Sequence, residues 1–223
     1  MTPSLAARLA GVEERLARAL QRAGRRREEI TLIGVSKVHP AAALREAYEA
    51  GLRHFGENYV QEFQAKRPEV GELPGAVFHM IGHLQSNKAR VAVDLFDVIH
   101  TVDTPRLARR LQEAGKRMQV LIEVKLSTED TKTGISEAEL PSLIEAIREL
   151  PCLDLRGLMV MPPWTENAEE SRPYFRRLRE IAARHALPEL SMGMSHDFEA
   201  AIEEGATMIR VGTAIFGPRR KPQ

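Results

Sequence analysis

The chain alternates between short apolar runs typical of β-strands and longer stretches with the period of an amphipathic helix, from residue 30 onward. This alternation predicts a parallel sheet, because the crossover between two parallel strands usually carries a helix. Eight such units in 223 residues predict one closed (β/α)8 barrel. The strand-like runs are Ile30–Ser36, Arg53–Gly56, Val77–Ile81, Val98–Val102, Gln119–Lys125, Leu155–Met161, Glu189–Met194 and Met208–Ile215.

Helical patterns fill the gaps between these runs, and an extra helix precedes the first of them. In that extra helix, apolar residues recur at spacings of three and four from Leu5 to Leu20, and Gly24 is expected to end it. We find no linker, so residues 1–223 are predicted to form a single domain; a doubly wound open sheet is the structural alternative. The helices between strands are expected at Ala41–Ala50, Tyr59–Lys66, Lys88–Leu95, Pro105–Ala114, Glu137–Leu150, Asn167–His185 and His196–Glu204.

Composition and charge exclude several classes of protein. The 32 basic and 31 acidic residues give a net charge of +1, so no overall field attracts nucleic acid or a membrane surface. Cys152 is the only cysteine, which excludes a disulfide or a cysteine-based zinc site within one chain. No run approaches the length of a membrane span, and the first ten residues are too polar for a secretory signal. We therefore expect a cytoplasmic protein without nucleic-acid or membrane partners. Since no exposed apolar stripe is evident, we also expect a monomer.

Polar residues and glycines gather after the carboxyl ends of the predicted strands, where barrels of this kind carry their function. Lys37 follows the first strand, and a buried ammonium without a partner is costly, so it either reaches solvent or serves chemistry. Asn58 follows the second strand, and His79 lies on the third. His79 and His83 are four residues apart, which suits a metal pair on a helix rather than on a strand, so we expect no metal site.

The last two loops indicate an anion site. Ser195 precedes the helix expected from His196, so it is a natural N-cap, and a helix start offers unpaired N–H groups to an anion. Gly212 and Thr213 lie in the last strand-like run, where a glycine lets a ligand approach the backbone and a hydroxyl donates a hydrogen bond. Barrels commonly bind phosphate between these two loops. Plain capping by Ser195 and a tight turn at Gly212 remain open as alternatives.

A lysine at the same barrel mouth as a phosphate site suggests a Schiff base to a phosphorylated aldehyde. Lys37 is the candidate amine, which a partly desolvated pocket would make nucleophilic. Arg210 alternates with Ile209 and Val211, so it points into the barrel if those two face the helices. An arginine there needs an acceptor, such as the ring nitrogen of a cofactor or an acidic loop residue.

Six motifs are spread over nearly the whole chain: L-I-G-V-S-K, F-G-E-N-Y-V-Q-E, F-H-M-I-G-H-L-Q-S-N-K, L-R-G-L-M-V-M-P-P, L-S-M-G-M-S-H-D-F-E-A-A-I and I-R-V-G-T-A-I-F-G. Together they resemble the YggS/PROSC family of pyridoxal phosphate homeostasis proteins. The resemblance extends from the first helix to Pro218. It implies a barrel like the N-terminal domain of alanine racemase, with pyridoxal 5′-phosphate as the cofactor.

The resemblance also implies roles for individual residues. Lys37 matches the lysine that holds the cofactor as an aldimine, and Arg210 matches the arginine that faces the pyridine nitrogen. Asn58 and His79 match residues near the ring. The positions that match the phosphate site are Ser195, Gly212 and Thr213.

The predicted activity is storage or delivery of the cofactor rather than robust catalysis. An arginine at the ring nitrogen disfavours its protonation, which weakens the ring as an electron sink. Racemases with this arrangement use a tyrosine from a second domain, and Tyr48, Tyr59 and Tyr174 all fall in expected helices. A carrier that serves pyridoxal-phosphate-dependent enzymes is therefore favoured. An amino-acid racemase is the alternative, and a sugar-phosphate enzyme is a third, cofactor-free possibility.

Overall fold

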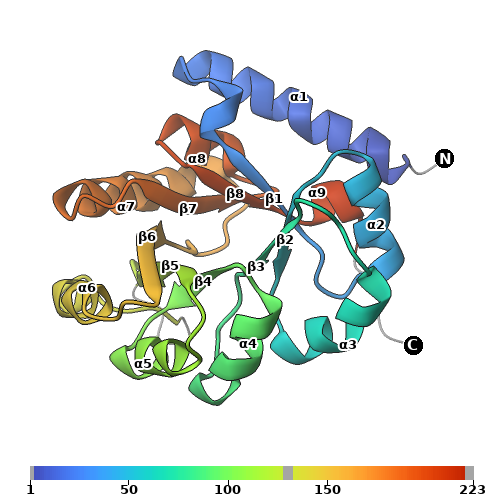
Figure 1. The fold of residues 1–223 in the computed structure, drawn as a ribbon. Helices are drawn as coiled ribbons and strands as arrows, with labels where there is room; N and C mark the ends of the chain where they lie inside the picture. Colours follow the sequence, from blue (N-terminus) through green and yellow to red (C-terminus); the bar gives the residue numbers. More distant parts are fainter. Residues whose placement is uncertain (1–2, 128–132, 219–223) are drawn as a thin grey trace.

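The computed structural model describes residues 3–127 and 133–218, in which eight parallel strands close into a barrel (Figure 1). The strands follow one another around the barrel in chain order. β1 pairs with both β2 and β8, so the predicted barrel is confirmed and the open sheet is excluded. The strands are β1 Thr31–Val35, β2 His54–Glu57, β3 Val77–Met80, β4 Val98–Val102, β5 Met118–Glu123, β6 Leu153–Met159, β7 Glu189–Met194 and β8 Met208–Val211.

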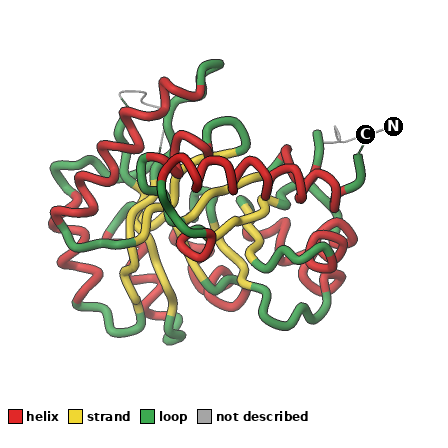
Figure 2. The backbone as a smooth tube through the Cα atoms, turned by 90° about the horizontal axis from the view of Figure 1, so that it is seen from above, coloured by secondary structure: helices red, strands yellow, loops and turns green. Residues whose placement is uncertain are grey.

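Helices surround the strands, which lie together in the middle of the molecule (Figure 2). The extra first helix ends as predicted at Gly24, which adopts the left-handed conformation with φ 64°. It packs against the last two helices. The α-helices are α1 Leu5–Ala23, α2 Ala41–Glu49, α3 Val60–Val70, α4 Ala89–Leu95, α5 Pro105–Glu113, α6 Leu140–Arg148, α7 Arg172–Arg184, α8 Phe198–Glu203 and α9 Thr213–Phe216, and the 3₁₀ turns are η1 Arg27–Glu29, η2 Ser86–Lys88 and η3 Ala168–Ser171.

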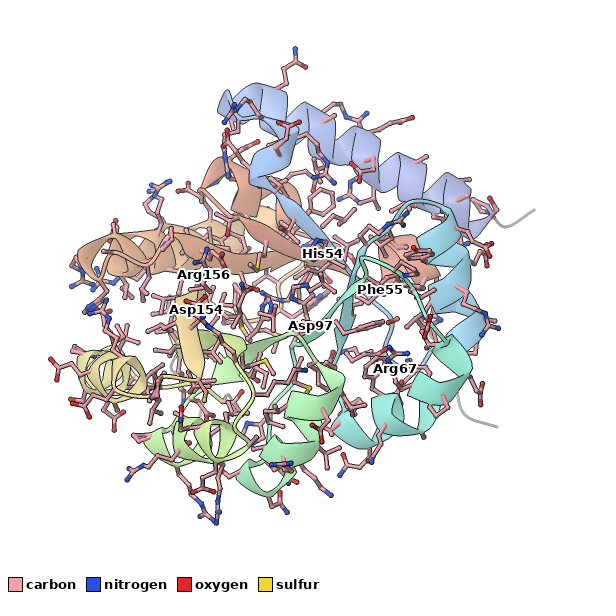
Figure 3. All side chains as sticks on the ribbon, in the orientation of Figure 1. His54, Phe55, Arg67, Asp97, Asp154 and Arg156 are labelled. Carbon is pink, nitrogen blue, oxygen red and sulfur yellow. The ribbon has the colours of Figure 1, made fainter. Side chains whose placement is uncertain are left out.

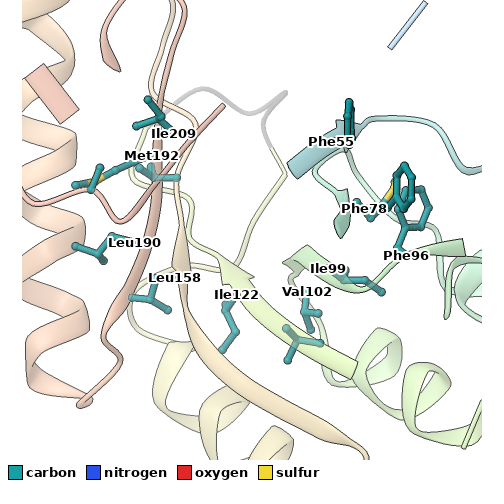
Figure 4. Packing of buried hydrophobic residues seen from close by; sticks show 14 of the residues in the cluster. Phe55, Phe78, Phe96, Ile99, Val102, Ile122, Leu158, Leu190, Met192 and Ile209 are labelled. Atoms are coloured by element: carbon teal, nitrogen blue, oxygen red, sulfur yellow. The ribbon is translucent and has the colours of Figure 1, made fainter. Parts of the chain in front are cut away.

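Apolar side chains form two layers, one between the strands and the helices and one inside the barrel. The outer layer holds most of the buried side chains, among them Phe55, Phe78 and Phe96 (Figure 4). The inner layer includes a small cluster of Ile33, Val98, Leu121 and Met208. Successive strand residues therefore face opposite sides, and the positions left over inside the barrel carry polar side chains.

Two predicted boundaries near the last loops are wrong. β8 ends at Val211, and the residues expected to continue it to Ile215 form the short helix α9. The helix expected from His196 begins at Phe198, because residues 194–197 first make a turn in which the Asp197 N–H donates to the Met194 carbonyl at 3.1 Å. Both differences lie at the barrel mouth and change how the last two loops present their polar groups.

None of the helices in the described ranges is both long enough and apolar enough to cross a membrane.

Candidate functional site

Lys37 lies half-buried directly after β1, at the carboxyl end of the strands. Its neighbour Val38 has a φ of 61°, in the left-handed region. A β-branched residue rarely adopts this conformation, and such strain is retained where the surroundings impose it, often at functional sites. The backbone next to Lys37 is therefore held in a specific, unfavourable shape.

Contacts from α3 hold this loop in place. The Val38 N–H donates to Glu62 Oε1 at 2.6 Å. Lys66 Nζ donates to the carbonyl oxygens of Ser36, at 3.1 Å, and of His39, at 3.2 Å. The residues on both sides of Lys37 are thus tied to one face of α3.

Lys66 is itself anchored by a buried carboxylate. Its Nζ lies 2.6 Å from Glu57 Oε1 at the end of β2, and Ser36 Oγ donates to the same oxygen at 2.8 Å. Burial raises the pKa of Glu57, and the Lys66 ammonium opposes that rise. Glu57 therefore acts through Lys66 and Ser36 on the shape of the Lys37 loop.

Asn58 follows Glu57 and presents an unsatisfied acceptor. Its Oδ1 atom is buried and has no hydrogen-bond partner among the described residues. The Asn58 backbone is pressed against Gly82, where an added Cβ would come within 2.3 Å of the Asn58 carbonyl oxygen. An unpaired buried acceptor costs free energy, so a rigidly placed one is a candidate ligand contact.

Ser195 and Gly212 meet across the ends of β7 and β8, where the Gly212 N–H donates to Ser195 Oγ at 3.1 Å. The prediction that Ser195 caps α8 is wrong, because Asp197 occupies the N-cap position. The expected proximity of the two loops is confirmed. Thr213 follows, exposed, as the first residue of α9.

Gly212 is not required by packing or by a left-handed backbone. Its φ is −103°, and an added Cβ would come no closer than 3.4 Å to Val35. A nearby cation adds to the site: Arg15 Nη2 donates to the Ser195 carbonyl at 3.2 Å while Glu199 neutralises part of its charge at 2.8 Å. With φ −103° and ψ −85°, however, the Gly212 backbone lies outside the region that other residues favour, and its N–H, beside a hydroxyl and a guanidinium, suits an anionic ligand.

Arg210 is buried inside the barrel, as its alternation with Ile209 and Val211 along β8 predicted. It pairs in register with Ile33 of the inner apolar cluster. Its Nη1 donates to Ser191 Oγ at 2.6 Å and its Nη2 donates to the Val160 carbonyl at 2.9 Å. Burial lowers its pKa to about 10, while the charges of Asp197 and Glu123 act against that change. The side chain stays cationic at neutral pH.

His79 lies deep in the barrel, in a line of side chains that sequence reasoning missed. His79 Nε2 is 3.0 Å from His54 Nδ1, and His79 Nδ1 is 2.9 Å from His100 Nε2. His100 Nδ1 is then 2.8 Å from Ser191 Oγ, the atom that accepts from Arg210. Both ring nitrogens of His79 are therefore engaged by other histidines and are not available to a cofactor.

The three histidines are neutral in the folded protein at neutral pH. Burial lowers the pKa of His79 to about 3 and that of His100 well below its usual value. The pKa of His54 is lowered by burial and by the charge of Arg27. The line therefore adds hydrogen bonds next to Arg210 without adding positive charge.

Comparison with known proteins identifies the family. The model of the alanine racemase N-terminal domain matches residues 9–220. A pyridoxal phosphate homeostasis protein from Aquifex aeolicus is 44% identical, over 96% of this chain and 97% of its own length. Another from Pseudomonas aeruginosa is 46% identical, over 97% of this chain and 96% of its own. The chain belongs to the pyridoxal phosphate homeostasis protein family.

Solved structures agree with this family assignment. PipY of Synechococcus elongatus with pyridoxal phosphate bound has a TM-score of 0.84 and 43% identity, and covers 96% of this chain and 100% of its own. Alanine racemase from Corynebacterium glutamicum has a TM-score of 0.66 at 20% identity, over 93% of this chain and 60% of the racemase. The racemase comparison shows the shared barrel fold alone, which confirms the fold that the resemblance implied.

Proposed function

We propose that this protein binds pyridoxal 5′-phosphate and acts in the homeostasis of that cofactor. The observation that carries the proposal is the convergence of three chemical groups on neighbouring strands: Lys37 after β1, the Ser195–Gly212 pair after β7 and β8, and Arg210 on β8. The name of the family and the bound cofactor of PipY support it.

These residues suit the three polar parts of pyridoxal phosphate. The Lys37 amine matches the aldehyde, with which it would condense to a Schiff base with loss of water. Ser195, Gly212 and Thr213 match the phosphate, which would replace the bond between Ser195 and Gly212 with bonds to itself. Arg210 matches the ring nitrogen, which can accept a hydrogen bond from a guanidinium that cannot itself accept one.

Asn58 Oδ1 is an unpaired buried acceptor suited to a donor on the bound ligand, such as a ring hydroxyl. We assign His79 no direct contact, because both of its nitrogens are already hydrogen-bonded. When bound, pyridoxal phosphate would supply an aldehyde for condensation with amines and a ring able to delocalise electrons.

A carrier role fits this site better than racemisation. The cationic Arg210 disfavours a second positive charge on the ring nitrogen, so the ring is a weak electron sink. Of the tyrosines, Tyr48 Oη donates to the Pro74 carbonyl at 2.8 Å, and Tyr59 is 57% exposed. The recipient enzymes, the monomeric state and the cytoplasmic location stay predictions.

The visible absorption spectrum of the purified protein tests the proposal. We expect a band from bound cofactor that survives dialysis in the wild type and is absent in Lys37→Ala, whose circular dichroism matches the wild type. A matched control is Lys116→Ala, which changes a lysine between α5 and β5, at the opposite end of the barrel from the three groups. A wild-type protein that retains no cofactor after loading with pyridoxal phosphate would contradict the proposed function.

A further inference from the structure

The line from His54 to Arg210 crosses the barrel interior, yet none of its histidines belongs to the proposed set of cofactor contacts. It begins at His54, the first residue of β2, inside the ring of strands (Figure 3). It continues through His79 and His100 to Ser191, with no separation between successive polar atoms longer than 3.0 Å. Side chains of three successive strands are thus connected, through Ser191, to the buried guanidinium of Arg210.

Arg210 determines the direction of every hydrogen bond in the line. A guanidinium only donates, so Ser191 Oγ must accept from Arg210. The hydroxyl hydrogen of Ser191 then needs an acceptor, and His100 Nδ1 is the other polar atom bonded to this oxygen within the described residues. A buried hydroxyl hydrogen left unsatisfied is costly, so Ser191 donates to His100.

The same reasoning about donors and acceptors determines which nitrogen of each histidine ring carries the proton. Because His100 Nδ1 accepts, its proton is on Nε2, which donates to His79 Nδ1. His79 therefore also carries its proton on Nε2 and donates to His54 Nδ1. All hydrogen bonds in the line run in one direction, away from Arg210 and toward the amino-terminal end of the barrel.

We propose that His100, supported by His79 and His54, is a positioning residue that orients the Ser191 hydroxyl and thereby aims Arg210 at the cofactor's ring nitrogen. By taking the Ser191 hydrogen, His100 leaves the lone pairs of Ser191 facing the guanidinium. The Val160 carbonyl holds the second Nη, so two of the five N–H groups of Arg210 are fixed. This inference rests on the proposed function for the identity of the ligand.

The line fixes which atoms carry protons, and it does not conduct protons. Conduction requires a terminal group that can take up and release a proton, and an arginine does not accept one near neutral pH. A neutral line also avoids placing a second cation beside Arg210. The expected result of breaking it is a change in the aim of Arg210, with no change in phosphate binding.

The first test uses protein labelled with nitrogen-15 histidine, without cofactor. We expect nuclear magnetic resonance to show His79 and His100 protonated on Nε2 and unprotonated on Nδ1 between pH 6 and 8. Assignments come from the loss of each signal in His79→Gln and His100→Asn. Protonation on Nδ1, or on both nitrogens, in either ring would overturn the proposed direction of the line.

The second test compares two variants of similar volume at one position. Asparagine can place its side-chain oxygen near the position of Nδ1 and accept from Ser191, whereas leucine cannot. With ring-nitrogen-labelled pyridoxal phosphate bound, we expect His100→Asn to keep the wild-type ring-nitrogen resonance. We expect His100→Leu and Ser191→Ala to shift it in the same direction, toward that of a protonated ring. Ser171→Ala removes a buried hydroxyl outside the line and serves as the control.

Competition by inorganic phosphate should be within a factor of two of wild type in all of these variants. If His100→Leu does not fold, Ser191→Ala, which removes a single oxygen, carries the comparison. Equal shifts in His100→Asn and His100→Leu, or none in Ser191→Ala, would overturn the positioning role. Failure of the wild type to bind pyridoxal phosphate overturns the proposed function and this role toward the cofactor, whereas wrong histidine tautomers with normal cofactor binding overturn the line alone.

Discussion

Lys66 Nζ lies 2.6 Å from Glu57 Oε1, and the two side chains, 8% and 0% exposed, form a buried ion pair beneath the loop that carries Lys37. The ammonium also donates to backbone carbonyls of Ser36 and His39. The pair therefore links the stability of the barrel mouth to the placement of the lysine. β2 and α3 supply the two charges of this ion pair, and the pair holds the loop after β1 in place.

Replacing Lys66 with methionine should be strongly destabilising. The change leaves the Glu57 carboxylate buried without its counter-ion, which typically costs about 3–5 kcal/mol. The double variant Glu57→Gln/Lys66→Met should recover part of this loss, because no charge is then buried. Urea unfolding measures both, with Arg110→Met as the control, since the Arg110–Glu113 pair is 54% and 59% exposed. A Lys66→Met variant as stable as the control would contradict the stabilising role of the buried Lys66–Glu57 ion pair.

The strain at Val38 predicts a gain in stability on mutation to glycine. Relief of a left-handed conformation at a β-branched residue is expected to exceed the entropy cost of glycine, for a net gain of about 1 kcal/mol. Ala186 has a φ of 53° far along the chain and gives a matched control.

We expect Val38→Gly to slow the condensation of Lys37 with pyridoxal phosphate, and Ala186→Gly to leave its rate unchanged. Stopped-flow absorbance measures the rate, and equal rates in all three proteins would mean that the strain does not serve the lysine.

Acid should destabilise the protein partly through His79. Its pKa falls from 6.5 to about 3 on burial, so below the higher value the unfolded chain binds a proton that the folded chain does not. Stability from this group is present above about pH 6.5 and is lost as pH falls toward 3, by up to about 1.4 kcal/mol per pH unit. His79→Gln should flatten the dependence in that window, and His83→Gln, at an exposed position, should not. Urea unfolding at pH 7, 5.5 and 4 measures the slopes, and an unchanged slope in His79→Gln would show that His79 titrates normally.

Thr213→Val should weaken binding of pyridoxal phosphate but not of pyridoxal. The hydroxyl is proposed to donate to a charged phosphate oxygen, an interaction typically worth about 1.5–3 kcal/mol. Valine is close to threonine in shape, so the exposed position loses mainly the donor. Equilibrium dialysis of the two ligands measures the ratio of affinities. Equal weakening of both would place the phosphate elsewhere.

The features predictable from sequence were those that repeat along the chain or depend on strand phase. Alternating strand and helix patterns predicted the closed barrel, and the inward direction of Arg210 followed from its apolar neighbours on β8. Lys37 was predicted as a site residue because a lysine after a buried strand is conspicuous, and that role stays a prediction. Each of these signals is local in the sequence, and the closed barrel is enough to place the residue at the mouth.

The contacts that were missed join residues far apart in the sequence. His100 and Ser191 are separated by 91 positions, and no local pattern marks two polar strand residues as neighbours. Lys66 and the Ser36 carbonyl, 30 positions apart, are brought together in the same way. The assignment of Ser195 as a cap failed because a turn precedes α8, in which the Met194 N–H donates to Asp197 Oδ1 at 2.7 Å.

Borohydride reduction of the cofactor-loaded protein, followed by peptide mass analysis, tests the central claim most directly. Reduction converts a Schiff base to a stable secondary amine and so marks the lysine that held the aldehyde. We predict one stoichiometric modification, on the peptide that carries Lys37, which is lost in Lys37→Ala. Stoichiometric modification of a different lysine in the wild type, or undiminished modification of Lys37→Ala, would contradict the assignment of the site.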